Sequence, residues 1–406
     1  MAKSFISKGK HQTPVKLIAD CAGLQNRAPD DYVDRSKALE LLAQCNTADL
    51  VQLAGKIRDK TKPGGIVTYS RKVFINLVNL CRDSCSYCTY KKEPGDPMVS
   101  LMNPSQVLAI AEVGRRLHCT EALFVTGERP EQKYPEASDW LRSLGHSSTV
   151  EYISEMSDLV LEKTGLLPHT NAGSLTKREM SLLKENNASI GVMLESSSER
   201  LMEKGMPHEG APSKNPKVRI KTLQGAGELK IPMTTGLLVG IGETPDELVD
   251  SLYVIKDIQS KYGNIQEVIM QNFAPKADTE MAFIAPPSTD YFLRAVALAR
   301  IVMPEMNIQV PPNLTPQIFG RYIDAGINDW GGISPVTIDH VNPEFPWPDI
   351  SMVRRVTEEK EKKLRARLPA YPEFVKGGFI TSDRLQDAIN LLADQSGLVR
   401  EGYSDE

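Results

Sequence analysis

Short apolar runs alternate along the chain with longer segments in which apolar residues recur every three or four positions. Runs of strand length that are apolar throughout are typical of strands buried on both faces of a parallel sheet. The spaced segments are typical of amphipathic helices. The pattern therefore predicts an α/β protein with strands at residues 73–80, 121–127, 166–173, 189–196, 232–242, 265–273 and 308–310.

The intervening helices carry start signals of their own. Asn103 followed by Pro104 is an N-cap with proline at the first helical position. Thr176 and Thr244 each stand three residues before a glutamate, which is the capping-box pattern. Strands and helices that alternate in this way imply parallel strands joined by right-handed crossovers. Six to eight such units predict a (β/α) TIM-like barrel, whole or partial.

The predicted barrel has extensions at both ends. A helical segment begins near Asp34 and ends at the breaker cluster of residues 63–65. We expect residues 1–65 to form a mostly helical N-terminal lead-in, 66–348 the barrel, and 349–406 a helical C-terminal extension. Residues 1–30 carry no periodic pattern and are expected to wrap the surface.

Composition narrows the class of protein further. With 41% hydrophobic and 25% charged residues, the 406-residue chain resembles an ordinary globular protein. A net charge of −4 gives no reason to expect a nucleic-acid or membrane partner. No run approaches the roughly 20 apolar residues that a membrane span needs, and the polar N-terminus does not resemble a signal peptide. We expect a cytoplasmic protein that acts on a small molecule.

Cys81, Cys85 and Cys88 follow the first predicted strand in a Cys-x3-Cys-x2-Cys pattern. Three thiolates on one tight loop can bind three irons of a [4Fe–4S] cluster, whereas a fully protein-ligated cluster takes four. One iron is thus left open for another ligand. A structural zinc site would need four ligands in paired spacings, and no second pair stands nearby. The remaining cysteines are isolated and are expected to be small buried residues: Cys21, Cys45 and Cys119.

Polar side chains stand where the predicted strands end, and in a barrel these ends gather at the face that carries the chemistry. Glu128 supplies a carboxylate after the second strand, and Gly127 permits close approach of the backbone. Glu195 ends an apolar run, and buried carboxylates are rare unless paired, so we expect it to face the barrel mouth. Asn171 can bond a ribose or a substrate. His169 is equally consistent with a hydrogen-bonded core histidine.

The three cysteines, with Tyr87 directly before the third, resemble the motif of the radical S-adenosylmethionine (SAM) superfamily. The resemblance implies a barrel of the radical SAM type, in which the open iron chelates the amino and carboxylate groups of SAM. Reductive cleavage of SAM then yields a 5'-deoxyadenosyl radical. A Gly-Gly-Glu element of that superfamily binds the amino group, and here Thr126 replaces its first glycine. The implied SAM contacts are Tyr87, Gly127, Glu128, Asn171, Glu195, Gly240 and Gly242.

Further stretches resemble the CofG-type subunits of FO synthase, which make the deazaflavin chromophore of coenzyme F-420. These stretches are residues 126–131 (TGERPE), 271–276 (QNFAPK), 328–335 (NDWGGISP) and 341–344 (VNPE). The resemblance implies closure of the deazaflavin ring from an adduct of a hydroxybenzyl group and a ribitylaminouracil. Ammonia, 5'-deoxyadenosine and methionine would leave, which is lyase chemistry. Because the chain has one cysteine motif, a separate CofH-type radical SAM subunit would supply the adduct.

The same resemblance implies substrate contacts by His169, Gln271, Asn272, Lys276, Asn328, Ser334 and Thr337. Proton transfer needs a general base, for which the candidates are Asp329, Asp339 and His340. Each candidate is equally consistent with a role in holding together residues 326–344, which we expect to form a glycine- and proline-rich loop.

Two rival functions remain open. One is another radical SAM enzyme with an aromatic substrate, of the type found in futalosine-dependent menaquinone synthesis, although the stretches at 328–335 and 341–344 favour FO synthase. The other is a non-catalytic iron–sulfur carrier, which has no need of carboxylates and glycines after successive strands of a long (β/α) chain.

Overall fold

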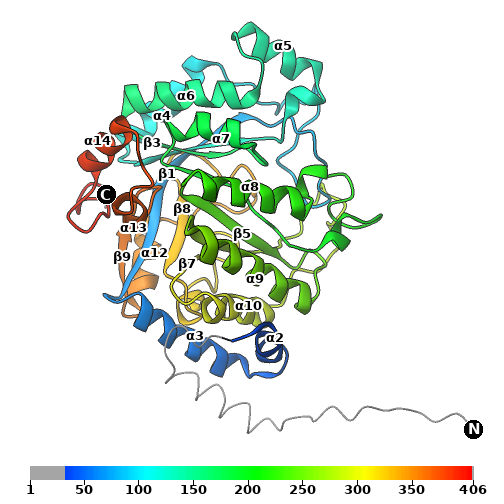
Figure 1. The fold of residues 1–406 in the computed structure, drawn as a ribbon, viewed down its shortest axis with the longest axis vertical. Coiled ribbons are helices and arrows are strands. Elements are labelled where there is room, and N and C mark those ends of the chain that lie inside the picture. The colour runs from blue at the N-terminus through cyan, green and yellow to red at the C-terminus, as the bar shows by residue number, and fades with distance from the viewer. Residues whose placement is uncertain (1–32, 405–406) are drawn as a thin grey trace, which may run out of the picture.

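Strand β1 (Ile66–Val78) is the seam at which the sheet closes on itself. In the computed structural model, which describes residues 33–404, β1 pairs in parallel with β2 (Glu121–Thr126) and with β8 (Asp329–Ile333). The other strands follow between them in chain order (Figure 1): β3 (Leu167–Asn171), β4 (Ser189–Gly191), β5 (Met233–Val239), β6 (Ile265–Asn272) and β7 (Asn307–Gln309). The predicted (β/α) barrel is confirmed, with eight parallel strands. Residues 1–30, with Cys21, lie outside the described residues.

Strand β8 was not predicted, because the loop expected over residues 326–344 contains it. Its sequence, Asp-Trp-Gly-Gly-Ile, has little strand propensity. The glycines instead make room inside the barrel. A Cβ atom on Gly331 would lie 2.0 Å from the Gln309 amide, and one on Gly332 would lie 2.4 Å from the Lys72 side chain. Close packing of the interior therefore explains a strand that local preference does not indicate.

Helices surround the barrel in the alternation that the sequence predicts (Figure 1). Asn103, Thr176 and Thr244 each form the capping box at the start of a helix. The main helices between strands are α4 (Pro104–Arg116), α6 (Thr149–Thr164), α7 (Lys177–Lys184), α8 (Pro216–Glu228), α9 (Pro245–Tyr262) and α10 (Thr289–Val302). The structure adds α5 (Pro135–Ser143), α11 (Arg321–Asp324) and the 3-10 turns η1 (Pro130–Gln132), η2 (Glu199–Met202) and η3 (Pro212–Lys214).

The described part of the N-terminal lead-in contains two helices. Helix α2 (Arg35–Gln44) is capped by Asp34 and packs against α9 and α10. Helix α3 (Thr47–Thr61) lies against α10 and α11 (Figure 1). Among residues 33–404, no helix is long and apolar enough to span a membrane.

The C-terminal extension is not only helical. Besides α12 (Ile350–Glu358), α13 (Pro372–Lys376) and α14 (Asp383–Leu392), it contains β9 (Lys363–Ala366). Strand β9 pairs in parallel with the first residues of β1. It lies along the same edge of β1 as β2, which pairs with later residues of that strand. Arg367 follows β9 directly and enters the barrel, where its guanidinium bonds Asp329 and Glu267 at 2.6 and 2.7 Å. The extension therefore completes the base of the barrel, which is the end at which the strands begin.

Candidate active site

A cavity of about 350 Å³ lies at the carboxyl ends of the barrel strands. Residues of strands β1 to β8 and of the loops that follow the strands line it. Most of the site residues predicted from the sequence meet here: Cys81, Cys85, Tyr87, Cys88, Gly127, Glu128, His169, Asn171, Glu195, Gln271, Asn272, Lys276 and Asp339. Residues far apart in the chain thus converge at the end of the barrel where function is expected.

The cysteine loop is held from two sides. The backbone N–H of Glu128 donates to Cys81 Sγ at 3.2 Å. The loop after β4 covers the other side, where Ser84 N–H donates to the Gly210 carbonyl at 2.7 Å. The Tyr87 hydroxyl lies 3.0 Å from His208 Nε2. These contacts fix the loop before any ligand binds.

The cysteines fit a cluster better than a single metal ion. All three line one cavity, while Cys45 and Cys119 are buried away from it. Among the described residues, no three His, Cys, Asp or Glu side chains surround a point where one ion would sit. Cluster thiolates each bind a different iron, so they need not converge. Burial raises the pKa of Cys81 to about 11 and that of Cys85 to about 12, so cluster binding would displace their protons.

Gly127 and Glu128 join the cysteine loop to β2. A Cβ atom on Gly127 would lie 2.0 Å from the Leu80 carbonyl oxygen, so only glycine fits where the two loops cross. Glu128 is buried, and its Oε2 accepts from Ser174 N–H at 3.0 Å. Its Oε1 accepts no hydrogen bond, and the Arg129 side chain lies 3.6 Å away. An unsatisfied buried carboxylate oxygen beside the cysteines suits a ligand ammonium group.

Glu195 faces the cavity in the left-handed backbone region, with φ of +63°. Such a conformation is uncommon outside glycine and clusters at functional sites. Its carboxylate forms an ion pair with Lys214, a residue that no sequence pattern had singled out. Burial works to raise the pKa of Glu195, but the neighbouring Lys214 outweighs it and holds the pKa below its ordinary value. The carboxylate is therefore ionised at the mouth of the cavity.

Gly240 and Gly242 adopt positive φ in the turn after β5, and neither lines the cavity. The N–H groups of Gly240 and Ile241 donate to the Glu243 carboxylate at 2.6 and 2.9 Å. These two donors are already used within the turn. A contact between this turn and adenine stays a prediction.

Three of the predicted substrate contacts lie outside the cavity lining. Asn328 is buried in the base, where its Oδ1 accepts from Arg300 at 2.7 Å. Ser334 accepts from Thr337 N–H at 2.9 Å, and the Thr337 hydroxyl accepts from Phe74 N–H at 2.9 Å. These groups hold β8 and the following loop against the barrel rather than reaching into the cavity.

The three candidates for a general base occupy different places. Asp329 is fully buried in the base and paired with Arg367. Asp339 lines the cavity, but its carboxylate accepts from the N–H groups of Val341 and Asn342 and so holds its own loop. His340 does not line the cavity. Of the three, the structure brings only Asp339 to the site.

The floor of the cavity is polar, which the sequence did not indicate. Lys72 Nζ donates to the Glu121 carboxylate at 2.6 Å, and Glu121 Oε1 lies 3.8 Å from His169 Nδ1. Glu267 and Gln309 also face this floor. A charged residue within an otherwise apolar strand, such as Glu267 in β6, was the signal available. Removing one partner of such a buried ion pair would destabilise the protein, because the other charge would be left uncompensated.

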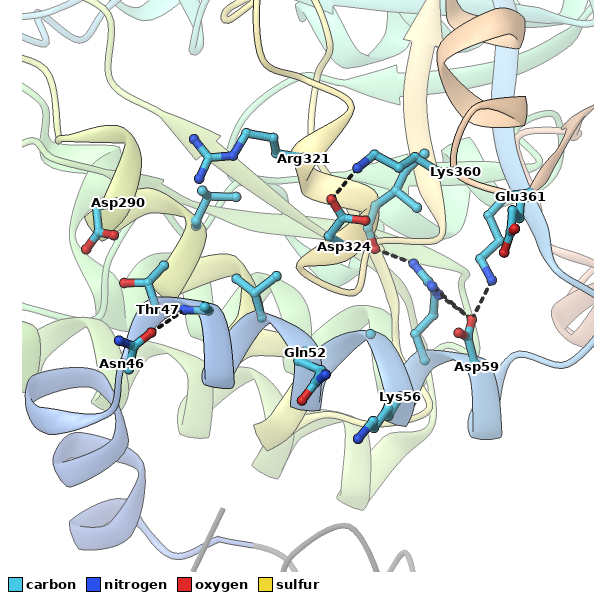
Figure 2. A pocket seen from close by; sticks show the side chains of 17 residues that line it. Asn46, Thr47, Gln52, Lys56, Asp59, Asp290, Arg321, Asp324, Lys360 and Glu361 are labelled. Atoms are coloured by element: carbon cyan, nitrogen blue, oxygen red, sulfur yellow. Dashed lines mark hydrogen bonds and ion pairs between the residues drawn. The ribbon is translucent and has the colours of Figure 1, made fainter. Parts of the chain in front are cut away.

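A second cavity, of about 790 Å³, opens between α3, α11 and the turn before β9 (Figure 2). Its charged side chains bond one another: Asp59 accepts from Lys362 and from Arg58, and Lys360 pairs with Asp324 (Figure 2). No cysteine lines it. The Asp59–Lys362 pair joins the lead-in to the C-terminal extension, and the Asp324–Lys360 pair joins α11 to that extension. The barrel cavity therefore remains the candidate active site.

Comparisons with known proteins identify the family that the chain resembles. The profile of the Radical SAM superfamily matches residues 75–253. The chain is 46% identical to 7,8-didemethyl-8-hydroxy-5-deazariboflavin synthase of Methanopyrus kandleri over 335 residues, which are 82% of this chain and 100% of that relative. It is 44% identical to FO synthase of Streptomyces avermitilis over 362 residues, covering 86% of this chain but only 42% of that longer relative.

Solved structures share the fold. The maturase HydG of Carboxydothermus hydrogenoformans superposes with a TM-score of 0.72 at 16% identity, covering 93% of this chain and 89% of that one. Methylornithine synthase (PylB) superposes with a TM-score of 0.65 at 18% identity, covering 86% and 96%. At these identities the likeness concerns the barrel alone.

Proposed function

Because the chain belongs to the radical SAM family of 7,8-didemethyl-8-hydroxy-5-deazariboflavin (FO) synthases, we propose that it closes the deazaflavin ring of FO in the barrel cavity. The substrate would be the hydroxybenzyl–ribitylaminouracil adduct, and ammonia, 5'-deoxyadenosine and methionine would leave, which makes the reaction that of a lyase. The observation that carries the proposal is the 46% identity to a synthase of that name over its full length.

We propose that Cys81, Cys85 and Cys88 hold a [4Fe–4S] cluster, and that SAM binds beside it. When bound, these cofactors supply the electron and the 5'-deoxyadenosyl group that begin the reaction. Glu128 Oε1 is suited to receive the methionine ammonium, because it is buried and lacks a hydrogen bond. Glu195 and Asn171 line the same wall and suit the polar remainder of SAM.

The inner part of the cavity would hold the substrate. Gln271 and Asn272 reach it from the end of β6, and Asn272 Oδ1 is buried without a hydrogen-bond partner. Lys276 Nζ donates to the Val341 carbonyl at 2.6 Å, which joins the loops after β6 and β8 above the cavity. These loops would keep water away from the reacting atoms.

We propose that the adduct is made at a second radical SAM active site. The chain spans 42% of the Streptomyces relative, and we propose that a CofH-type radical SAM subunit supplies the adduct in trans. Stable association is not required, since a released intermediate can also reach the cavity.

Anaerobic reconstitution with iron, sulfide, SAM and a reductant tests the proposal. With the adduct as substrate, we expect deazaflavin fluorescence together with 5'-deoxyadenosine. 5'-Deoxyadenosine without the chromophore would favour a different aromatic substrate, as in the futalosine-type enzymes. An intact cluster whose EPR spectrum does not change on addition of SAM would favour an iron–sulfur carrier.

A further inference from the structure

His169 stands on the cavity floor with one ring nitrogen in a short hydrogen bond and the other in a single long contact. It is buried, it projects from β3, and it lines the cavity next to Asn171 and Gly191. Its Nδ1 lies 2.6 Å from the Ser189 hydroxyl oxygen. Its Nε2 makes one long contact, 3.4 Å from Asn171 Oδ1, which is at the weak end of hydrogen-bond distances.

The hydrogen-bond chain decides which nitrogen carries the proton. The Ser189 hydroxyl also lies 2.9 Å from the Pro369 carbonyl oxygen, which can only accept. Since a hydroxyl has one proton to donate, Ser189 donates it to Pro369 and must accept from His169. Nδ1 is therefore the N–H, and in the neutral ring Nε2 is a bare acceptor. Burial lowers the pKa of His169 to about 4 against the opposing charge of Glu121, so the ring is neutral near pH 7.

Two neighbours shape the space around Nε2. Gly191 leaves it uncovered on the β4 side, because a Cβ atom there would lie 2.9 Å from Nε2. Lys72 provides a cation nearby: its Nζ and His169 Nδ1 lie 2.6 and 3.8 Å from the same Glu121 oxygen. Lys72 carries three N–H donors, and its Nζ also lies 5.9 Å from the centroid of the Phe74 ring. The floor thus offers an acceptor and a donor side by side.

We infer that His169 Nε2 accepts the ring N–H of a pyrimidinedione at the cavity floor, with Lys72 donating to an adjacent ring carbonyl. This rests on the proposed function, because a ribitylaminouracil carries an N–H between two carbonyls. The uracil end of the substrate then lies deepest, and the hydroxybenzyl end lies toward the cysteine loop. Ser189 acts as a positioning residue through the tautomer of His169, and the Pro369 carbonyl couples that tautomer to the C-terminal extension.

A pair of ligands and a pair of variants test the inference. Reconstituted protein is equilibrated by anaerobic dialysis with 6-ribitylaminouracil or with its N3-methyl derivative, which lacks the N–H. His169→Asn can keep a donor toward Ser189 but has no group at Nε2. His169→Gln can place an amide oxygen near that position. Iron content and thermal unfolding establish that each variant is folded.

We expect the wild-type protein to prefer 6-ribitylaminouracil about tenfold or more, because a buried acceptor left unpaired is costly. His169→Asn should abolish that preference, and His169→Gln should retain most of it. Ser189→Ala should reduce the preference severalfold, since the ring is then free to change tautomer. Equal binding of the two ligands by the wild-type protein, or an undiminished preference in His169→Asn, would overturn the inference.

The test separates this inference from the proposed function. If the wild-type protein forms FO but binds both uracils equally, the assignment of His169 is wrong and the reaction stands. If neither uracil binds to protein that still binds SAM, the inference fails together with the proposed substrate.

Discussion

Glu128 is the side chain whose replacement should separate SAM binding from cluster binding. We expect Glu128→Gln to weaken SAM binding about tenfold or more, because hydrogen bonds to charged groups contribute about 1.5–3 kcal/mol. The Ser174 N–H can still be satisfied by the amide oxygen. Equilibrium dialysis with labelled SAM and an iron assay measure the two properties.

Glu131→Gln is the matched control for Glu128→Gln. It removes the same charge three residues away, where Glu131 accepts from the Thr149 hydroxyl outside the cavity. Its SAM affinity should match that of the wild-type protein. Unchanged affinity in Glu128→Gln would contradict the role proposed for this carboxylate.

The cysteines are the second test at this scale. We expect Cys85→Ala to lose the reconstituted cluster and all SAM cleavage, because two thiolates no longer hold the iron–sulfur core. Cys45→Ala, at a buried cysteine away from the cavity, should retain four irons and full cleavage. Iron analysis and measurement of 5'-deoxyadenosine compare the two variants. Four irons with full activity in Cys85→Ala would refute the cysteine assignment.

Individual site residues were predictable where a motif or a strand end singled them out, as for Cys81 and Glu128. Lys72 and Lys214 were not, because their partners Glu121 and Glu195 lie far away in the chain and only the folded barrel joins them. Asp329 was a candidate general base, but its ion pair with Arg367 places it in the base of the barrel, outside the cavity lining.

At the scale of elements, β9 contributes to stability mainly through Arg367, the residue that follows it. Arg367 compensates both Asp329 and Glu267 in a buried setting. We expect Arg367→Met to lower the free energy of unfolding by about 3–5 kcal/mol, because it isolates two buried carboxylates. Denaturant unfolding measures this loss.

Arg365→Met, within β9 itself, is the control for Arg367→Met. Arg365 pairs with Asp394 and Glu401 nearer the surface, and exposed pairs contribute about 0–1 kcal/mol. Equal losses in the two variants would show that β9 acts only as a strand and not through the buried ion pairs.

Elements with strong local signals were predictable, and those defined by packing were not. The first seven strands overlap the apolar runs of the sequence, and the capped helices carry side chains that bond their own N-termini. Strand β8 depends on glycines that accommodate Lys72 and Gln309, and β9 on its pairing with β1. Such features depend on contacts between distant parts of the chain, which periodicity does not report.

The whole barrel brings the cysteine loop, the carboxylates and the polar floor to one cavity, with the loop on one side and His169 within. If the uracil end lies on the floor, the hydroxybenzyl end is held near the cysteines. Holding both ends of the substrate in fixed positions brings the reacting groups close together, which favours the reaction.

The most direct test uses an adduct deuterated at all of its carbon-bound positions. Wild-type enzyme, SAM and a reductant are allowed to react anaerobically, and the mass of the 5'-deoxyadenosine is measured alongside FO fluorescence. The account predicts deuterium in 5'-deoxyadenosine that appears together with FO. Unlabelled 5'-deoxyadenosine and no FO, from protein with an intact cluster, would contradict the claim that this cavity closes the deazaflavin ring.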